Sequence, residues 1–419
     1  MRYYLITYGC TLNRADSDRM DLILSQEGHV RVDRLELADV VVFNTCGVKE
    51  ATHNRVIETL RKLRSLGIPT VVTGCMYVAE KEIRKVYPEV VILPTMCEHM
   101  ISRAVDQVVS GRWGTITCEG FKPLHLPKVE GVISRIPISE GCLGSCTYCF
   151  TRVARGILHS YKPVDIRRTM EYAVQQGARE IQITSQDTGA YGLDIGTDLP
   201  TLLGSLLDVE GDYRIRLGMI NPQFVIRYLR QLTGILSSSR MYRFIHIPVQ
   251  SGSDRVLRDM KRGYTREQVD LIVKRLRESI PDITIATDLI IGYPTETEDD
   301  FLETLDLIKR DRFDVVNVSR FSPRPYTEAK HLRPLDNRLV KERIRRVNSL
   351  IDEIIHEKLS KWVGREVEVI ITEKQKTYTG RTDNYLPVGV LGEVNLGDRV
   401  IVSITDVHNY TLIGELVDQ

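Results

Sequence analysis

Three cysteines within eight residues form the most specific chemical motif of this chain. They stand in the run CLGSCTYC at residues 142–149, as Cys142, Cys146 and Cys149, directly after an expected strand. A structural zinc site takes four ligands, and no further Cys or His stands nearby to complete a tetrahedron. A [4Fe-4S] cube also takes four ligands, so three cysteines leave one iron open to a substrate or cofactor. A three-cysteine structural metal site and a chance grouping are the alternatives.

A second set of cysteines is spread over the first 75 residues. Cys10, Cys46 and Cys75 each follow an expected strand, in the runs YGCTLN, NTC and TGC. Since the carboxyl ends of neighbouring parallel strands meet at one edge of a sheet, these three side chains should converge there. Inert buried cysteines are the alternative. Cys97 and Cys118 fall outside both sets and are expected to be ordinary core or surface residues, because cysteine is too sparse here for a disulfide scaffold.

The elements that would position these cysteines follow an α/β pattern. Up to about residue 110, β-rich runs alternate with amphipathic helices, which indicates a flavodoxin-like or Rossmann-like parallel sheet. The expected strands are Tyr3–Tyr8, Val40–Asn44 and Thr70–Thr73. The expected helices are Ala15–Gln26 and Lys49–Ser65. A Gly- and Pro-containing linker over residues 119–127 then separates an N-terminal domain, 1–118, from a second one, 128–356.

The second expected domain contains six strand candidates. They are Val132–Ile138, Glu180–Thr184, Arg214–Met219, Phe244–Val249, Thr284–Ile291 and Val315–Phe321. Six strand-helix units predict a partial (β/α)6 barrel, short of the eight of a closed one. An apolar stripe over residues 335–359 predicts one long helix, and alternating Val and Ile after Gly364 predict a small all-β barrel within a third domain, 357–419.

Charge and hydropathy limit the classes of partner. With 57 basic and 56 acidic residues, no global field draws the chain to nucleic acid or membrane, so any RNA contact must be local. No apolar stretch is long enough to span a bilayer and no signal peptide stands at the start, so we expect a cytoplasmic protein without a membrane partner. The local candidate is Lys330–Arg346, with seven basic and two acidic residues, where Arg338, Lys341 and Arg345 share a helical face. Ordinary solvated surface is the alternative.

The two cysteine sets, with this order of elements, resemble the radical S-adenosylmethionine methylthiotransferase family along essentially the whole chain. The resemblance implies two [4Fe-4S] clusters, one on each cysteine triad, and S-adenosylmethionine on the open iron of the downstream cluster. It implies that an electron from this cluster splits the cofactor into methionine and a deoxyadenosyl radical, which attacks adenine C2. Sulfur would arrive through the upstream cluster, and a second cofactor molecule would supply methyl. A radical route suits an aromatic C–H that is too weakly acidic for any general base.

The resemblance also implies site residues outside the cysteines. Family segments that contact the cofactor match Tyr148, Ser185, Gln186, Arg216, Gln250 and Asp288, with His246 beside them. Most of these stand at strand ends, where an active-site rim belongs, although helix caps and other structural roles are alternatives. Arg324, in the run FSPRPYT, is left with a phosphate contact at most. The C-terminal module resembles the RNA-binding TRAM barrel, which adds Arg381, but its seven basic and ten acidic residues from position 357 favour the helix as the main RNA contact.

The cluster loop and its flank, residues 141–161, are similar to the archaeal and eukaryotic branch of that family. This implies a substrate adenosine that already carries N6-threonylcarbamoyl at tRNA position 37. A substrate with a carboxylate favours cationic rim groups such as Arg152, Arg155 or Arg216, although these arginines can equally bind the cofactor carboxylate or pair with Asp or Glu. The implied partners are tRNA, an electron donor protein and a sulfur source. The alternatives are methylthiolation of isopentenyl-adenosine tRNA or of a ribosomal protein and, in another class, a non-catalytic iron-sulfur redox sensor that binds RNA.

Overall fold

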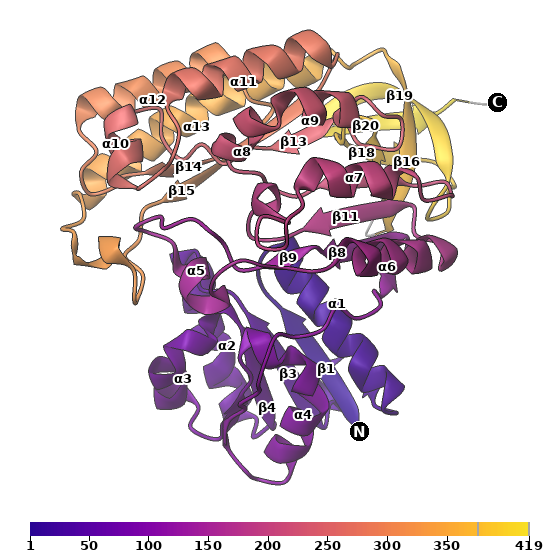
Figure 1. Ribbon diagram of the computed structural model, residues 1–419, viewed down its shortest axis with the longest axis vertical. Helices are drawn as coiled ribbons and strands as arrows, with labels where there is room; N and C mark the ends of the chain where they lie inside the picture. Colours follow the sequence, from indigo (N-terminus) through magenta and orange to yellow (C-terminus); the bar gives the residue numbers. More distant parts are fainter. Residues whose placement is uncertain (375–376, 418–419) are drawn as a thin grey trace. The chain divides into compact units, whose positions relative to one another are not determined.

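The computed structural model describes residues 1–374 and 377–417, which form two compact units (Figure 1). The first unit contains Met1–Lys128, Arg135–Thr169 and Ser322–His331. The second contains Val129–Ser134, Met170–Phe321 and the described chain from Leu332 onward. Within the described ranges, no helix combines the length and the apolar character that crossing a membrane requires.

A parallel six-stranded sheet forms the centre of the first unit. Its order is β2-β1-β3-β4-β5-β6. The strands are β1 (Arg2–Thr7), β2 (Val30–Arg31), β3 (Val40–Thr45), β4 (Thr70–Gly74), β5 (Val90–Ile92) and β6 (Gly114–Thr115). This is the strand order of flavodoxin-like sheets, with the switch in direction between β1 and β3. The predicted N-terminal fold is therefore confirmed.

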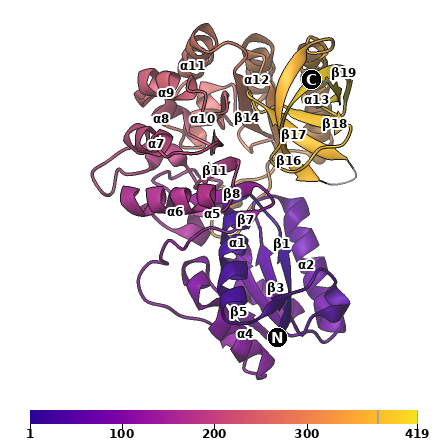
Figure 2. The same cartoon turned by 90° about the vertical axis from the view of Figure 1, so that its right-hand side faces the viewer.

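Helices cover both faces of this sheet, because β3 and β4 are apolar on both sides (Figure 2). On one face lie α1 (Thr11–Gln26) and α4 (Ile101–Val109), and on the other α2 (Glu50–Ser65) and α3 (Glu80–Val86). Val42 packs in one cluster with Met20 of α1, whereas its neighbour Phe43 packs in the opposite cluster with Leu60 of α2. Burial on both faces fixes the register of the central strands, and with it the place where each strand ends.

The second unit contains the predicted partial barrel. Its strands are β8 (Ile133–Pro137), whose first two residues belong to this unit, β11 (Glu180–Thr184), β12 (Arg214–Leu217), β13 (Phe244–His246), β14 (Thr284–Ile291) and β15 (Val315–Arg320). β11 pairs in parallel with β12, and β14 pairs in parallel with β13 and β15. A bridge between Ile215 and Met241 continues the curve from β12 toward β13. Each of the six expected strands is present.

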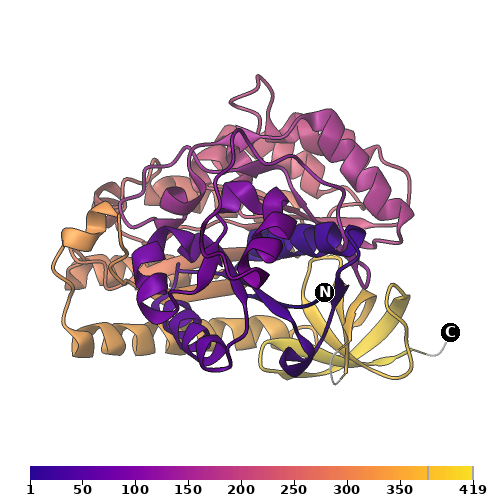
Figure 3. The same ribbon diagram turned by 90° about the horizontal axis from the view of Figure 1, so that it is seen from below.

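One long helix leads from the partial barrel into the C-terminal module (Figure 3). This helix, α13 (Asn337–Ser360), starts where the Asp336 carboxylate accepts hydrogen bonds from the backbone N–H of Arg338 at 2.8 Å and Leu339 at 3.2 Å. The closed barrel that follows has the order β16-β17-β18-β20-β19. Its strands are β16 (Glu366–Lys374), β17 (Tyr378–Thr382), β18 (Pro387–Leu391), β19 (Arg399–His408) and β20 (Thr411–Leu416). The expected small all-β barrel is confirmed.

Short elements complete the described chain. In the first unit they are η1 (Leu35–Leu37), η2 (Cys75–Ala79), η3 (Thr95–Met100), β9 (Ser139–Glu140), α5 (Phe150–Arg155), β10 (His159–Ser160) and η5 (Glu328–His331). In the second unit they are β7 (Val129–Glu130), η4 (Thr188–Ala190), α7 (Leu199–Leu207), α8 (Pro222–Arg227), α9 (Leu229–Leu236), α10 (Asp254–Asp259), α11 (Arg266–Ser279) and α12 (Glu298–Asp311). The helix α6 (Pro163–Gln175) starts in the first unit and ends in the second.

Cys97 and Cys118 form a disulfide, with their Cα atoms 5.6 Å apart. Both pack in the apolar core of the first unit, as expected of small core residues, but the expectation that they are ordinary is wrong because they are bonded to each other. Cys97 lies in η3, just after β5, and Cys118 follows β6. Because β6 pairs in parallel with β5, the two segments leave the sheet at the same edge and the cysteines meet there. The sequence separation of 21 residues conceals this proximity.

Candidate active site

Two of the three N-terminal thiols, those of Cys10 and Cys75, lie against one buried amide, the side chain of Asn13. Its Oδ1 atom lies 3.7 Å from the sulfur of Cys10 and 3.8 Å from that of Cys75. Cys46 interacts electrostatically with Cys10 and with Cys75. Cys10 precedes α1, Cys46 follows β3 and Cys75 follows β4, so the predicted convergence at the carboxyl edge of the sheet is found.

Asn13 is fixed at the switch between β1 and β3. Its Nδ2 donates to the carbonyl oxygen of Tyr8 at 3.1 Å and to that of Thr45 at 2.9 Å. These bonds tie the ends of the two strands together where ligands bind in open α/β sheets. Beside them, Gly74 has a φ of +79°, and a Cβ there would lie 2.3 Å from the Thr45 carbonyl oxygen. Only glycine fits this approach, which turns the chain so that Cys75 faces the same point.

The downstream cysteine loop is compact as well. The backbone N–H of Gly144 donates to the sulfur of Cys142 at 3.2 Å. A Cβ built on Gly144 would lie 3.4 Å from the Cys142 sulfur and 3.7 Å from the Cys146 sulfur, so both sulfurs surround this glycine. The Cys149 N–H donates to the Cys146 carbonyl at 3.1 Å, and Arg152 donates to the carbonyls of Cys142 and Gly144. Three thiols on one loop that is held by its own hydrogen bonds suit ligation of a cluster with an open iron.

A buried group of charges lies next to the N-terminal thiols. Arg155, at the end of α5, donates to Asp16 at 2.5 Å, to Glu140 at 2.9 Å and to Asn13 Oδ1 at 3.0 Å. The Lys122 ammonium lies 2.9 Å from Asp16 and 2.7 Å from Glu140. The other members are Arg19 and Glu98. This buried ion cluster connects the expected linker, helix α1 and both flanks of the downstream cysteine loop.

Electrostatics within the cluster follow from burial and pairing. Burial alone would raise the pKa of Asp16, but Arg155, Lys122 and Arg19 together hold it well below its usual range. Burial and the nearby Asp16 charge raise the pKa of Glu98 to about 8. Burial also raises the pKa of the Cys75 thiol to about 12, against the opposing influence of Arg155. Loss of the Cys75 proton therefore needs a strong positive partner, which a cluster iron would be.

The expectation that Arg155 forms a rim for the substrate is wrong, whereas that for Arg152 stays a prediction. Arg155 is only 3% exposed, and its guanidinium is occupied by Asp16, Glu140 and Asn13. Arg152 holds the carbonyls of its own loop. Sequence reasoning also missed Asn13, although it stands in the run YGCTLN three residues after Cys10. The spacing of one helical turn was the available signal.

In the second unit, the predicted cofactor residues lie on or after the barrel strands. Ser185 and Gln186 follow β11, and the buried Gln186 Oε1 has no hydrogen-bond partner among residues 1–374 and 377–417. Asp288 of β14 lies between its neighbours: its carboxylate is 3.0 Å from His246 Nε2 and accepts from Asn317 at 2.9 Å. Three adjacent strands thus join their polar side chains in one row. Tyr148, on the cysteine loop, belongs to the first unit.

Arg216 and Gln250 take different positions in this unit. The Arg216 guanidinium lies 5.0 Å from the ring centroid of Phe244 and 5.8 Å from that of Tyr385, which comes from the C-terminal barrel. Gln250 has a φ of +75°, unusual for a residue with a side chain, and its backbone pairs with β14 at Asp288 and Ile290. Arg216 is thus engaged by aromatic rings, and Gln250 sits in a strained turn of the kind that gathers at functional sites.

The basic face predicted on α13 is present. Arg338, Lys341 and Arg345 are exposed, and no side-chain partner is found for them in the described parts of the chain. Arg343 departs from the run: it is buried, lies 2.6 Å from Glu296 and holds α13 to the partial barrel. Arg381 is half-buried beside Glu373 and lies 4.8 Å from the centroid of the Tyr385 ring, so it is partly occupied within the barrel.

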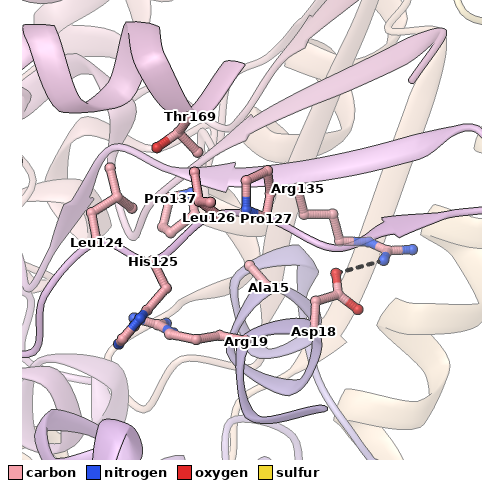
Figure 4. A pocket seen from close by; sticks show the side chains of 10 residues that line it. All are labelled: Ala15, Asp18, Arg19, Leu124, His125, Leu126, Pro127, Arg135, Pro137 and Thr169. Atoms are coloured by element: carbon pink, nitrogen blue, oxygen red, sulfur yellow. Dashed lines mark hydrogen bonds and ion pairs between the residues drawn. The ribbon is translucent and has the colours of Figure 1, made fainter. Parts of the chain in front are cut away.

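A small hollow in the first unit is lined by α1, by the end of the expected linker and by Arg135 and Pro137 of β8 (Figure 4). The figure shows an ion pair between Arg135 and Asp18 and places His125 near Arg19. The nitrogen and oxygen of this ion pair are 2.9 Å apart. Its volume of about 10 Å³ holds roughly one water molecule. It is therefore too small for a nucleobase.

No three His, Cys, Asp or Glu side chains of the described ranges stand around a single point as one metal ion requires.

Three protein families match successive parts of the chain. Residues 2–93 match a family described only as uncharacterized protein family UPF0004, residues 136–308 the radical SAM superfamily and residues 360–417 the TRAM domain. A probable threonylcarbamoyladenosine tRNA methylthiotransferase of Archaeoglobus fulgidus is 40% identical over 99% of this chain and 99% of its own length. The chain belongs to the threonylcarbamoyladenosine tRNA methylthiotransferase family. This membership confirms the radical S-adenosylmethionine chemistry, with its [4Fe-4S] clusters, that the two cysteine triads predicted.

Other members of this methylthiotransferase family come from distant organisms. A probable member from Pyrococcus horikoshii is 37% identical over the full length of both chains, and one from Drosophila melanogaster is 36% identical over all of this chain and 78% of its own. Among solved structures, the radical S-adenosylmethionine methyltransferase TsrM from Kitasatospora setae has a TM-score of 0.57 at 15% identity, with 78% of this chain and 77% of that chain covered. At that identity, the likeness concerns the fold alone.

Proposed function

We propose that this chain methylthiolates adenine C2 of N6-threonylcarbamoyladenosine at position 37 of tRNA, which gives 2-methylthio-N6-threonylcarbamoyladenosine. The observation that carries this proposal is family membership along the whole chain together with two separate thiol triads in one compact unit. A redox sensor needs only one iron-sulfur group and no partial barrel. The presence of both triads and of a complete strand set favours catalysis.

We assign Cys142, Cys146 and Cys149 to one [4Fe-4S] cluster and Cys10, Cys46 and Cys75 to the other. When bound, the cluster on the downstream triad would supply the electron that cleaves S-adenosylmethionine to a carbon radical, and the cluster on the N-terminal triad would present sulfur. The chain itself orients these ligands. Gly144 and Arg152 hold the downstream loop, and Asn13 contacts the Cys10 and Cys75 thiols at the sheet edge.

The remaining partners follow from this reaction. Exposed Arg338, Lys341 and Arg345 would contact phosphates of the tRNA, as cations on one helical face can. Reductive cleavage needs an electron donor protein, and methylthiolation needs a sulfur source. Since the substrate is tRNA, we assign the protein to the cytoplasm. Ser185, Gln186 and Asp288 would contact the cofactor from the strands of the partial barrel.

Competition between substrates tests the function. The protein is reconstituted with iron and sulfide, then offered tRNA with threonylcarbamoyl-adenosine, isopentenyl-adenosine or plain adenosine at position 37 under identical reducing conditions. Mass spectrometry of the nucleosides should find methylthio product on the threonylcarbamoyl form first. Preference for the isopentenyl form would overturn the substrate assignment and keep the reaction class, whereas no methylthio product on any tRNA would overturn both.

A further inference from the structure

The segment Ser322–His331, which follows β15, folds into the first unit with both cysteine triads. The backbone N–H of Ala329 donates to the carbonyl of Thr147 at 2.9 Å, and Thr147 stands between Cys146 and Cys149. Within the segment, the Thr327 hydroxyl donates to the Arg324 carbonyl at 2.8 Å. Tyr326 adopts a left-handed φ of +64°. The backbone around Arg324 is therefore fixed against the downstream cysteine loop.

The side chain of Arg324 is buried, and one edge of its guanidinium is open. It is 6% exposed, and its Nε and Nη2 atoms are buried without a hydrogen-bond partner in the described residues. Burial lowers the pKa of this guanidinium, while Glu50, Cys46 and Glu82 act in the opposite direction from beyond hydrogen-bond contact. A buried cation normally has a paired anion, because an unpaired one loses its hydration without compensation. A partner for this edge of Arg324 is missing from the described part of the chain.

The geometry of the open edge defines the chemistry of that partner. Nε and Nη2 belong to one edge of the planar guanidinium, so their N–H groups point in parallel. Two oxygens of a carboxylate or phosphate match such a pair with two charge-assisted hydrogen bonds. A neutral amide offers one oxygen, and a cation is repelled. The electrostatic interaction of Arg324 with Cys46 places this anion site beside the upstream triad.

Burial distinguishes between the two anions that a tRNA substrate offers. Contacts to the phosphate backbone are made at the protein surface by long exposed side chains such as those on α13. A base that undergoes chemistry is taken out of its stack into the active site, and its substituents enter with it. The threonylcarbamoyl group carries one carboxylate. We propose that Arg324 recognises this carboxylate through Nε and Nη2, which rests on the function proposed above.

The decisive experiment measures binding by the full reconstituted protein rather than turnover. Four anticodon stem-loop RNAs are used, with threonylcarbamoyl-adenosine, its methyl ester, isopentenyl-adenosine or adenosine at position 37. Wild-type protein should bind the first about 10- to 100-fold more tightly than its methyl ester, as for loss of a charged hydrogen-bonded pair. Arg324→Gln should bind the acid and the ester equally. Arg324→Lys should recover part of the preference, because it keeps the charge and loses the fork.

Controls separate this inference from other outcomes. Arg333→Gln removes an exposed cation two residues beyond the segment, and it should keep the preference for the acid over the ester. If wild-type protein binds acid and ester equally, the inference is overturned without any variant. Equal weakening of all four RNAs by Arg324→Gln would mean a phosphate contact and would also overturn it. If wild-type protein methylthiolates the threonylcarbamoyl RNA while Arg324→Gln retains the preference, only this inference fails and the proposed function stands.

Discussion

Arg155 Nη2 donates to Asn13 Oδ1 across 3.0 Å, although the two residues are 142 positions apart in the chain. Asn13 supports the upstream thiols, and Arg155 closes the helix that follows the downstream thiols. The same guanidinium satisfies Asp16 and Glu140 in the buried ion cluster. The two cysteine triads therefore share one electrostatic support, and a change at Arg155 should affect both folding and iron binding.

Removal of the Arg155 charge should destabilise the apoprotein strongly. Arg155→Met leaves Asp16 and Glu140 buried with one cation fewer, and breaking such a buried pair costs about 3 to 5 kcal/mol. Denaturant unfolding under reducing conditions measures the change in unfolding free energy. Arg310→Met is the control, because Arg310 pairs with Asp270 at the surface and such pairs contribute little. Equal effects of the two substitutions would contradict the role of the buried ion cluster.

The two triads should separate by mutation. Cys149→Ala should abolish formation of deoxyadenosine while about half of the iron, that of the upstream cluster, remains. Cys46→Ala should keep formation of deoxyadenosine and lose methylthiolated product. Iron analysis and the deoxyadenosine assay on both variants check this. Unchanged iron content and product in Cys46→Ala would refute a second cluster on the N-terminal thiols.

The exposed basic face of α13 should neutralise tRNA phosphates additively. Reversal of Arg338, Lys341 and Arg345 to Glu should weaken binding. It should also reduce the slope of log affinity against log salt concentration by roughly 0.7 to 0.9 for each phosphate that is no longer neutralised. The measurement is tRNA affinity over a series of salt concentrations. The control reverses three exposed cations of α2, which are Arg55, Arg61 and Lys62. An equal change in slope for both triples would point to net charge instead of a specific binding surface.

His125 should make stability depend on pH below neutrality. Burial, together with the neighbouring cations Arg19 and Lys122, lowers the pKa of His125 to about 4. Since the unfolded chain binds this proton nearer pH 6.5, the stabilising contribution is complete above that pH and is lost as pH falls toward 4. Thermal unfolding between pH 4 and 7 should have a shallower slope in His125→Gln than in wild type. His356→Gln, on the exposed side of α13, should leave the slope unchanged.

The disulfide between Cys97 and Cys118 should stabilise the first unit. The bridge spans 21 residues. Closure of a loop of that length lowers the conformational entropy of the unfolded chain, which raises the free energy of unfolding by roughly 3 kcal/mol. Cys97→Ser should lower the unfolding free energy by a similar amount. Addition of dithiothreitol should reproduce this decrease in wild type and add nothing in the variant. If the reductant destabilised both proteins equally, the effect would not come from this bridge.

The sequence by itself determined the elements and both cysteine triads. The β-rich run Val40–Asn44 and the spacing of Cys142, Cys146 and Cys149 can each be recognised within a short stretch of sequence, without knowledge of the fold. The convergence of Cys10, Cys46 and Cys75 also followed, because parallel strands with helical crossovers end at one edge of the sheet. The long basic helix followed from its apolar period.

Only the tertiary structure decided which residues meet across distant segments. The sequence suggested Arg155 as a substrate contact. In the structure it is buried and donates to Asp16, Glu140 and Asn13, so it stabilises the interior of the first unit. Cys97 and Cys118 pair because β6 lies parallel to β5, and this neighbourhood cannot be recognised from either segment alone. The open edge of Arg324 is likewise invisible in the run FSPRPYT. The role of Arg155, the pairing of the two cysteines and the open edge of Arg324 all depend on which side chains are buried together. Burial of residues from distant segments is set by the tertiary structure.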